Sequence, residues 1–157
     1  GYCGNNKSQW SLINKRGDVK CTHQYDTSHY DQINYIDYSF TYIAVNNMKT
    51  RVYVSVYYLN SLFCFDMKGR KQFTYSPDNL ESPSGVAVDR YDYIYVLGLL
   101  SNHIHQLSPD GSVLQIITSG VPEYQQAICI HKSKDILIIT TGSDETKKLH
   151  IHQLKYN

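Results

Sequence analysis

The amino-acid sequence predicts an all-β fold built from repeated units of short antiparallel strands. Fifteen tyrosines against four prolines and nine glycines favour strands. Apolar residues alternate in short runs that are separated by turn signals such as Pro109-Asp110-Gly111, and we find no stretch with the 3.6-residue apolar spacing of a helix. The same pattern of strands and turns recurs about every 42 residues, which indicates an internal repeat.

The clearest copy of the repeat runs from Pro83 to Leu114. Its apolar runs and turn residues predict strands at Val86–Val88, Tyr93–Val96 and Ile104–Leu107, and a fourth strand that starts at Val113. A Pro-Asp-Gly turn between alternating apolar runs is a strong hairpin signal, so the third and fourth strands are expected to pair. We call the four strands of one unit a, b, c and d.

The other copies appear when this unit is shifted by about 42 positions. The backward shift places Gly111 on Gly69 and Val96 on Val54, and the forward shift places Val96 on Ile138. Four short strands in a repeat of this length are typical of the blades of a β-propeller. The predicted blades span residues 1–25, 40–76, 83–118 and 125–157, with a long loop at 26–39.

The predicted blades are not all complete. The first copy lacks strand a and the last copy ends after strand c, so the chain holds about 3.5 blades. We expect the C-terminal part of a longer propeller, in which a missing segment supplies the closing strand of the last blade, since a closed ring leaves no open sheet edge. An arc of this size exposes apolar surface between blades, so self-association or marginal stability is expected without the missing blades.

The pentapeptide HIHQL occurs twice, at 103–107 and at 150–154. Two H-x-H pairs suggest a metal site, because His103 and His105 share one face of a strand. Histidine pairs alone lack the carboxylates or thiols that usually complete such a site. The second copy falls in the same strand c of the repeat, so the favoured interpretation is a pair of repeat-equivalent strands packed between blades, with no metal or other cofactor.

Composition limits the function classes. A net charge of +1 gives no overall field for recruiting nucleic acid or an anionic membrane. No run of eighteen apolar residues is present, so no membrane partner is expected. The four cysteines, Cys3, Cys21, Cys64 and Cys129, lie far apart, which favours reduced and buried thiols in a cytoplasmic protein.

One blade resembles the NHL repeat, whose blades follow the pattern P-x-G-V-A-V-D…I-Y-V…N-x-I…(D/S)-P-D-G. The residues that carry this resemblance are Pro83, Gly85, Val86, Ala87, Val88, Asp89, Ile94, Tyr95, Val96, Asn102, Ile104, Pro109, Asp110 and Gly111. The other blades match more weakly, and blade two has Phe40-Thr41-Tyr42 in place of the Pro-x-Gly start. The resemblance implies a partial NHL-type β-propeller, a fragment of a six-bladed ring.

Tyrosine-rich, divergent blades of this kind look like the C-terminal propeller of tripartite-motif (TRIM) proteins. That resemblance implies a ubiquitin ligase whose RING domain carries the activity and whose propeller recognises substrates or RNA. None of the zinc-binding Cys/His spacing of a RING domain is present here, so no catalytic residue is predicted in this chain. The expected function is therefore a non-catalytic, substrate-recognition module.

Binding is predicted on the side of the propeller that carries the d–a and b–c loops, which we call the loop face. Two loops there are longer than their counterparts, within 26–39 and 140–148, and this face has an excess of acidic residues. Loops displayed by a rigid scaffold are common binding sites, and tyrosines mixed with acids suit a protein partner. The candidate binding residues are Tyr30, Asp31, Tyr35, Asp37, Tyr38, Asp144 and Glu145.

Two other functions are weaker candidates. RNA binding needs clustered cations, and the basic residues gather on the opposite side, which carries the a–b and c–d turns and which we call the turn face. A metal-dependent lactonase or lyase of the propeller type needs carboxylates, amides or histidines at the channel ends of the inner strands. The strand-a starts contain no acid, so this constellation is not found.

Overall fold

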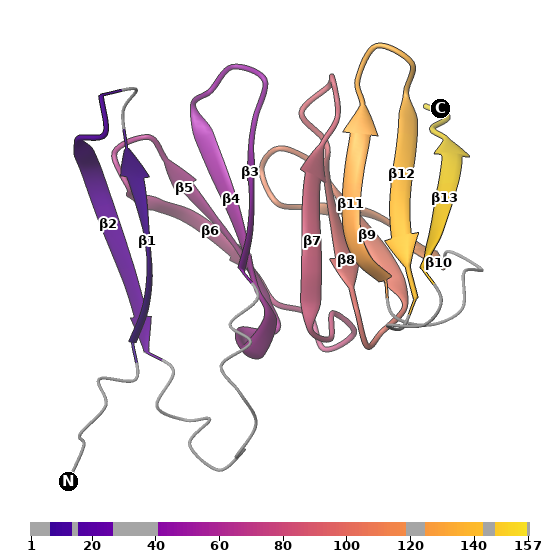
Figure 1. The fold of residues 1–157 in the computed structure, drawn as a ribbon, viewed down its shortest axis with the longest axis horizontal. Helices are drawn as coiled ribbons and strands as arrows, with labels where there is room; N and C mark the ends of the chain where they lie inside the picture. The colour runs from indigo at the N-terminus through magenta and orange to yellow at the C-terminus, as the bar shows by residue number, and fades with distance from the viewer. Residues whose placement is uncertain (1–6, 14–15, 27–40, 119–124, 143–146, 157) are drawn as a thin grey trace, which may run out of the picture.

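The described residues of the protein form four antiparallel β-sheets that follow one another along the chain (Figure 1). The computed structural model describes residues 7–13, 16–26, 41–118, 125–142 and 147–156. Within these residues every regular element is a strand except for one short 3-10 turn, η2, at Tyr57–Leu59. The predicted all-β class is therefore confirmed.

Two of the sheets are complete four-stranded units. Blade 2 has the order β3-β4-β5-β6 and blade 3 the order β7-β8-β9-β10, so each is a meander in which consecutive strands pair. The strands of blade 2 are β3 (Thr41–Val45), β4 (Arg51–Val56), β5 (Ser61–Asp66) and β6 (Lys71–Tyr75). Those of blade 3 are β7 (Pro83–Val88), β8 (Ile94–Gly98), β9 (His103–Leu107) and β10 (Val113–Thr118).

The two outer sheets have fewer described strands. Blade 1 consists of β1 (Lys7–Ile13) and β2 (Val19–Asp26), and blade 4 of β11 (Gln125–His131), β12 (Ile136–Thr141) and β13 (Lys148–Gln153). Residues 1–6, the start of the first predicted blade, lie outside the described residues. In blade 4 the third strand, β13, has one free edge among the described strands.

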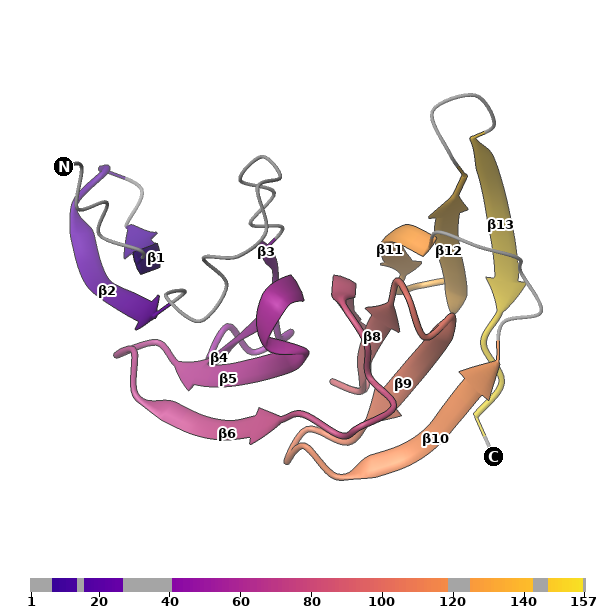
Figure 2. The same cartoon turned by 90° about the horizontal axis from the view of Figure 1, so that it is seen from below.

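The sheets are arranged as an open arc, with β3 and β11 on its inner side and β6 and β10 on its outer side (Figure 2). Strand β7 packs between β3 and β11. This is the blade arrangement of a β-propeller that does not close on itself, and the prediction of a partial propeller is confirmed.

The a–b turns show that blades 2 and 3 are copies of one unit. In blade 2 the Asn46 Oδ1 atom accepts hydrogen bonds from the backbone N–H groups of Thr50 and Arg51, at 2.8 and 2.9 Å. In blade 3 the Asp89 Oδ1 atom accepts from the backbone N–H groups of Tyr91 and Tyr93, at 2.8 and 2.9 Å. Short polar side chains favour turns because they satisfy local backbone donors in this way.

The c–d turns repeat as well. Gly69 and Gly111 adopt positive φ values of 79° and 94°, a region that residues with a Cβ atom seldom enter. Each glycine N–H donates to the carbonyl of the residue three positions earlier, at 2.9 Å in both turns. The alignment of these glycines by sequence is therefore correct in three dimensions.

The apolar core lies between the blades. One cluster, which includes Tyr53, Leu62, Val88 and Leu107, fills the space between blades 2 and 3. A second, which includes Leu97 and Ile139, fills the space between blades 3 and 4. Gly85 permits a close approach of β7 and β11, since a Cβ atom there would lie 3.0 Å from the Ile128 Cγ2 atom.

The two HIHQL segments occupy equivalent strands, β9 and β13, each the third strand of its sheet. The register of the neighbouring strand differs from the predicted alignment. His105 is opposite Val96 on β8, whereas His152 is opposite Leu137 on β12, so Val96 corresponds to Leu137 and not to Ile138. This one-residue difference moves Leu137 to the side that faces blade 3 and turns Ile138 to the other side of the sheet.

Candidate functional site

The residues predicted to bind a partner, Tyr30, Asp31, Tyr35, Asp37, Tyr38, Asp144 and Glu145, all lie outside the described residues. The described strand ends that flank them can be placed. Asp26, Thr41, Thr141 and Lys148 are at the same end of the strands, the lower end in Figure 1. The described strand ends that border the two long connections therefore lie on one side of the arc, the predicted loop face.

The contact between blades 2 and 3 contains a buried polar pair. The Tyr75 hydroxyl on β6 forms a 2.7 Å hydrogen bond with the Nδ1 atom of His105 on β9. The two rings meet edge to face, with centroids 5.8 Å apart, and the imidazole is fully buried. Burial lowers the pKa of His105, with neighbouring His103 adding to the effect, so the ring is neutral at physiological pH.

The contact between blades 3 and 4 is packed less completely. A cavity of about 290 Å³ lies between β8–β10 and β12–β13. Its walls include Tyr95, Ile104, Ile117, Leu137 and His152. The Nε2 atom of His152 is buried and has no hydrogen-bond partner among the described residues. This cavity is a candidate site for a small ligand.

A chain of hydrogen bonds runs along the blade 3 wall of this cavity. The Gln115 amide donates to the Gln106 carbonyl oxygen at 2.5 Å, and the Gln106 amide donates to the Tyr95 hydroxyl at 2.7 Å. The Tyr95 hydroxyl in turn donates to the Asp89 Oδ2 atom at 3.3 Å. Burial and the Asp89 carboxylate raise the pKa of Tyr95, so its hydroxyl stays protonated and remains a donor.

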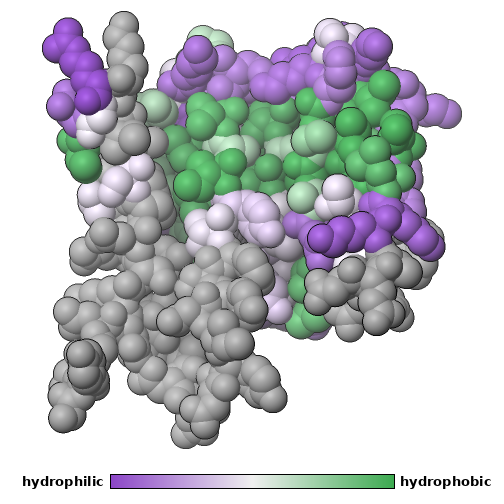
Figure 3. Space-filling view, viewed as in Figure 1, coloured by the Kyte–Doolittle hydropathy of each residue, from purple (hydrophilic) through white to green (hydrophobic). Residues whose placement is uncertain are grey.

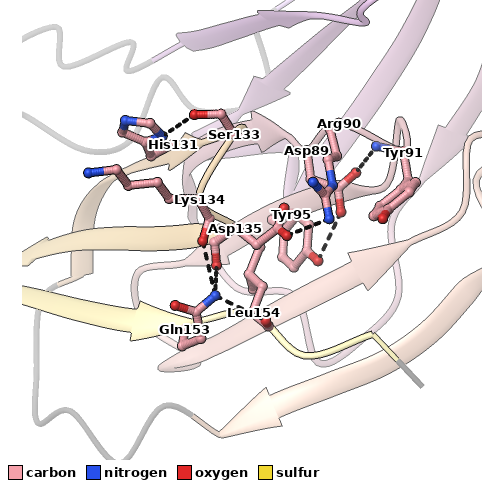
Figure 4. Close-up of polar contacts among 10 residues, drawn as sticks. All are labelled: Asp89, Arg90, Tyr91, Tyr95, His131, Ser133, Lys134, Asp135, Gln153 and Leu154. Carbon is pink, nitrogen blue, oxygen red and sulfur yellow. Dashed lines mark hydrogen bonds and ion pairs between the residues drawn. The ribbon is translucent and has the colours of Figure 1, made fainter.

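The turn face carries a polar network that ties the blades together (Figure 4). The Arg90 guanidinium of blade 3 lies 2.6 Å from the Asp135 carboxylate of blade 4, and it also covers the Tyr91 ring at 4.8 Å. Asn47 of blade 2 donates its backbone and side-chain N–H groups to Asp92 of blade 3, at 2.8 and 2.7 Å.

Other cations on the turn face also have partners within the fold. Lys132 of blade 4 donates to the Asn47 side-chain oxygen, and Arg51 of blade 2 donates to the Pro109 carbonyl oxygen. Arg70 pairs with Asp66 of its own turn at 2.7 Å. These cations of the turn face therefore join two blades or stabilise a turn within one blade.

Blade 4 presents an uncovered apolar sheet face. Its pairing register puts Cys129, Ile138 and Ile151 in one row across β11, β12 and β13, on the side away from blade 3. Ile151 is 64% exposed, whereas Ile104, at the same place in the first HIHQL segment, is 1% exposed because blade 4 covers it. Viewed as in Figure 1, a further apolar band crosses the inner side of the arc (Figure 3).

The cysteine prediction needs a correction. Cys64 is a buried free thiol, and burial raises its pKa to about 11, so it is inert. Cys129 is also free but exposed, because it lies on the uncovered face of blade 4.

Among the described residues there is no cluster of three or more His, Cys, Asp or Glu side chains, and no helix long and apolar enough to span a bilayer.

Comparisons with known proteins support the fold. No protein-family model and no curated protein sequence matches the chain. The solved β-propeller domain of Cps50 (Swd1) from Myceliophteria thermophila is similar over 96% of this chain and 46% of its own, with a TM-score of 0.69 at 12% identity. Virginiamycin B lyase from Staphylococcus aureus is similar over 96% of this chain and 49% of its own, with a TM-score of 0.63 at 16% identity.

Hydrazine synthase from Kuenenia stuttgartiensis is also similar, over 78% of this chain and 35% of that one, with a TM-score of 0.64 at 12% identity. The chain thus spans half or less of the length of these three structures. At such identities the likeness defines the class of protein, an open β-propeller segment, and nothing finer.

Proposed function

We propose that the chain is a non-catalytic protein-interaction module. The observation that carries this proposal is the uncovered face of blade 4, where Leu149 and Ile151 are 62% and 64% exposed. Ile104, the equivalent of Ile151, is buried by the next blade. The face of blade 4 therefore carries apolar side chains of the kind that form protein contacts, and they are exposed. Exposed apolar patches on soluble domains commonly mark protein-interaction sites.

The finer proposal is a substrate-recognition propeller of the TRIM-NHL type, working in the cytoplasm as part of a ubiquitin ligase. This finer proposal is supported by blade 3, in which residues that carry the NHL resemblance have structural roles. Asp89 braces the a–b turn, Gly85 admits the next blade and Gly111 shapes the c–d turn. The substrate is expected to contact the acidic, tyrosine-rich loops on the loop face.

A capture experiment with charge-reversed loops tests this proposal. The wild-type chain, the double variant Asp31→Lys/Asp37→Lys and a control, Lys68→Glu/Lys71→Glu, are immobilised and exposed to cell extract. The control changes the same number of charges at exposed positions of the turn face. We expect the wild type and the control to capture the same proteins, and the Asp31/Asp37 variant to lose them while its circular dichroism is unchanged.

The outcomes separate the alternatives. Equal capture by all three chains contradicts the loop site, and no capture by any of them contradicts the interaction module. If captured material is lost after ribonuclease treatment, or is not captured by the Lys68→Glu/Lys71→Glu variant, the chain binds RNA. The affinity for RNA should then fall steeply as the salt concentration rises. Turnover of a lactone or a cyclic peptide by the purified chain indicates a lyase-like enzyme.

A further inference from the structure

Blade 3 contacts blade 2 and blade 4 through equivalent positions of the repeat, but the side chains at these positions differ. Tyr75 on β6 is opposite Leu62 in its own sheet, and Ile117 on β10 is opposite Ile104. Ile104 follows Leu62 by 42 positions and Ile117 follows Tyr75 by 42 positions, so Ile117 is the repeat counterpart of Tyr75. His152 is likewise the counterpart of His105 in the pentapeptide HIHQL.

The change from tyrosine to isoleucine removes a ring and a hydroxyl from the second contact. Between blades 2 and 3 the Tyr75 ring covers His105 and its hydroxyl binds the imidazole at 2.7 Å. Between blades 3 and 4 the aliphatic Ile117 cannot reach out in this way. What remains is a cavity lined by both Ile117 and His152, with the His152 Nε2 atom buried and lacking a partner.

The size and walls of this cavity suit one aromatic ring. Its volume is about 290 Å³, and an apolar cavity of roughly half that volume can hold benzene. Ile104, Ile117 and Leu137 supply apolar walls. Thr118, Gln153 and Lys155 also line it and are exposed, so the cavity has a route to solvent.

The polar groups of the cavity define what the ring should carry. The Tyr95 and Gln115 side chains on the blade 3 wall already hydrogen-bond to Asp89 and Gln106. His152 on the opposite wall is the group with unmet hydrogen-bonding capacity, and a buried polar atom without a partner is unfavourable. A neutral hydroxyl can meet this need without placing a charge between the two sheets.

We propose that the cavity between blades 3 and 4 binds a phenol ring, which takes the place that Tyr75 occupies in the preceding contact and forms a hydrogen bond with His152. The phenol can belong to a small molecule or to a tyrosine side chain of a bound peptide. This site is separate from the loops of the proposed function, since it lies inside the blade stack and needs no loop residue.

The test uses 4-methylphenol, which has the ring and hydroxyl of a tyrosine side chain. Titration into the isotope-labelled chain is followed by two-dimensional NMR, with toluene as the matched ligand that lacks the hydroxyl. We expect saturable shifts at Ile117, Leu137 and His152. Toluene should bind about five- to tenfold more weakly, the worth of one hydrogen bond.

Two variants check the location. Ile117→Tyr restores the side chain of the preceding contact, so it should abolish binding of 4-methylphenol and raise the thermal midpoint. His152→Phe keeps a ring but removes the imidazole, so binding should fall to the level of toluene. Absence of saturable binding to the folded wild type, or equal binding to the Ile117→Tyr variant, overturns the proposal.

A second pair of ligands separates the two sources of the phenol. N-acetyltyrosinamide and a short peptide with a central tyrosine are titrated in the same way, with the phenylalanine peptide as control. Tighter binding of the tyrosine peptide than of 4-methylphenol identifies a peptide site, and the reverse order identifies a small-molecule site. Loss of partner capture in the Asp31→Lys/Asp37→Lys variant leaves both titrations unchanged, so the two proposals fail independently.

Discussion

Replacing Tyr75 with phenylalanine tests how blades 2 and 3 are joined. The variant keeps the ring but removes the 2.7 Å hydrogen bond to His105, so the buried Nδ1 atom of the imidazole loses this partner. A hydrogen bond contributes about 1 kcal/mol, and an unsatisfied buried polar group costs roughly 1–3 kcal/mol. We therefore expect the free energy of unfolding to fall by about 2 kcal/mol.

Urea unfolding followed by circular dichroism measures this loss, and Tyr53→Phe is the matched control. Tyr53 belongs to the same core cluster and is fully buried, but its hydroxyl has no hydrogen-bond partner. The Arg51 guanidinium lies beside this hydroxyl and lowers its pKa against the larger, opposite effect of burial, and it also donates a hydrogen bond to the Pro109 carbonyl. Removing that hydroxyl should change stability by less than about 0.5 kcal/mol or increase it.

The difference between the stability losses of the two variants tests the role of the Tyr75 hydrogen bond. Equal effects of Tyr75→Phe and Tyr53→Phe would refute the reasoning, because the loss could then be attributed to any hydroxyl in this core. A double-mutant cycle of Tyr75→Phe with His105→Phe adds a second check, since the coupling energy should be at least about 0.5 kcal/mol for a direct contact.

Three further outcomes are expected. Acid should destabilise the chain below about pH 6.5, because unfolded His105 gains a proton that the folded state resists; urea midpoints at pH 7 and 5.5 should fall less in His105→Gln. Gly85→Val should cost about 1–3 kcal/mol in urea unfolding by crowding Ile128, with partial recovery in Ile128→Ala. Ile151→Lys should reduce self-association in light scattering at unchanged stability, whereas Ile104→Lys should prevent folding.

Much of the fold could be predicted from sequence because its signals are local. Gly111 and Asp89 mark turns whose backbone hydrogen bonds are formed by residues within a few positions, so a shift along the sequence finds their copies. The match of Val96 to Ile138 failed for a different reason. Strand register depends on which side chains the neighbouring blade buries, and apolar residues at both Leu137 and Ile138 leave this choice open in the sequence.

The candidate sites divide in the same way. The length and charge of the two long loops predict the partner-binding residues, and these stay predictions because they lie outside the described residues. The cavity was missed, although the change from Tyr75 to Ile117 can be seen in the aligned repeats. This change predicts a cavity only if both positions are known to face a histidine on the next blade. Sequence spacing alone does not show which residues are in contact between sheets. The exposure of Cys129 was missed for the same reason.

The repeated sheets stack face to face as propeller blades. The most direct measurement is the nuclear Overhauser effect between the Gly85 Hα protons on β7 and the Ile128 Cγ2 methyl group on β11. These residues belong to neighbouring blades, and a Cβ atom at Gly85 would lie 3.0 Å from that methyl carbon. The blade stack predicts a strong cross-peak, and its absence from an assigned spectrum of the folded chain would contradict the arrangement.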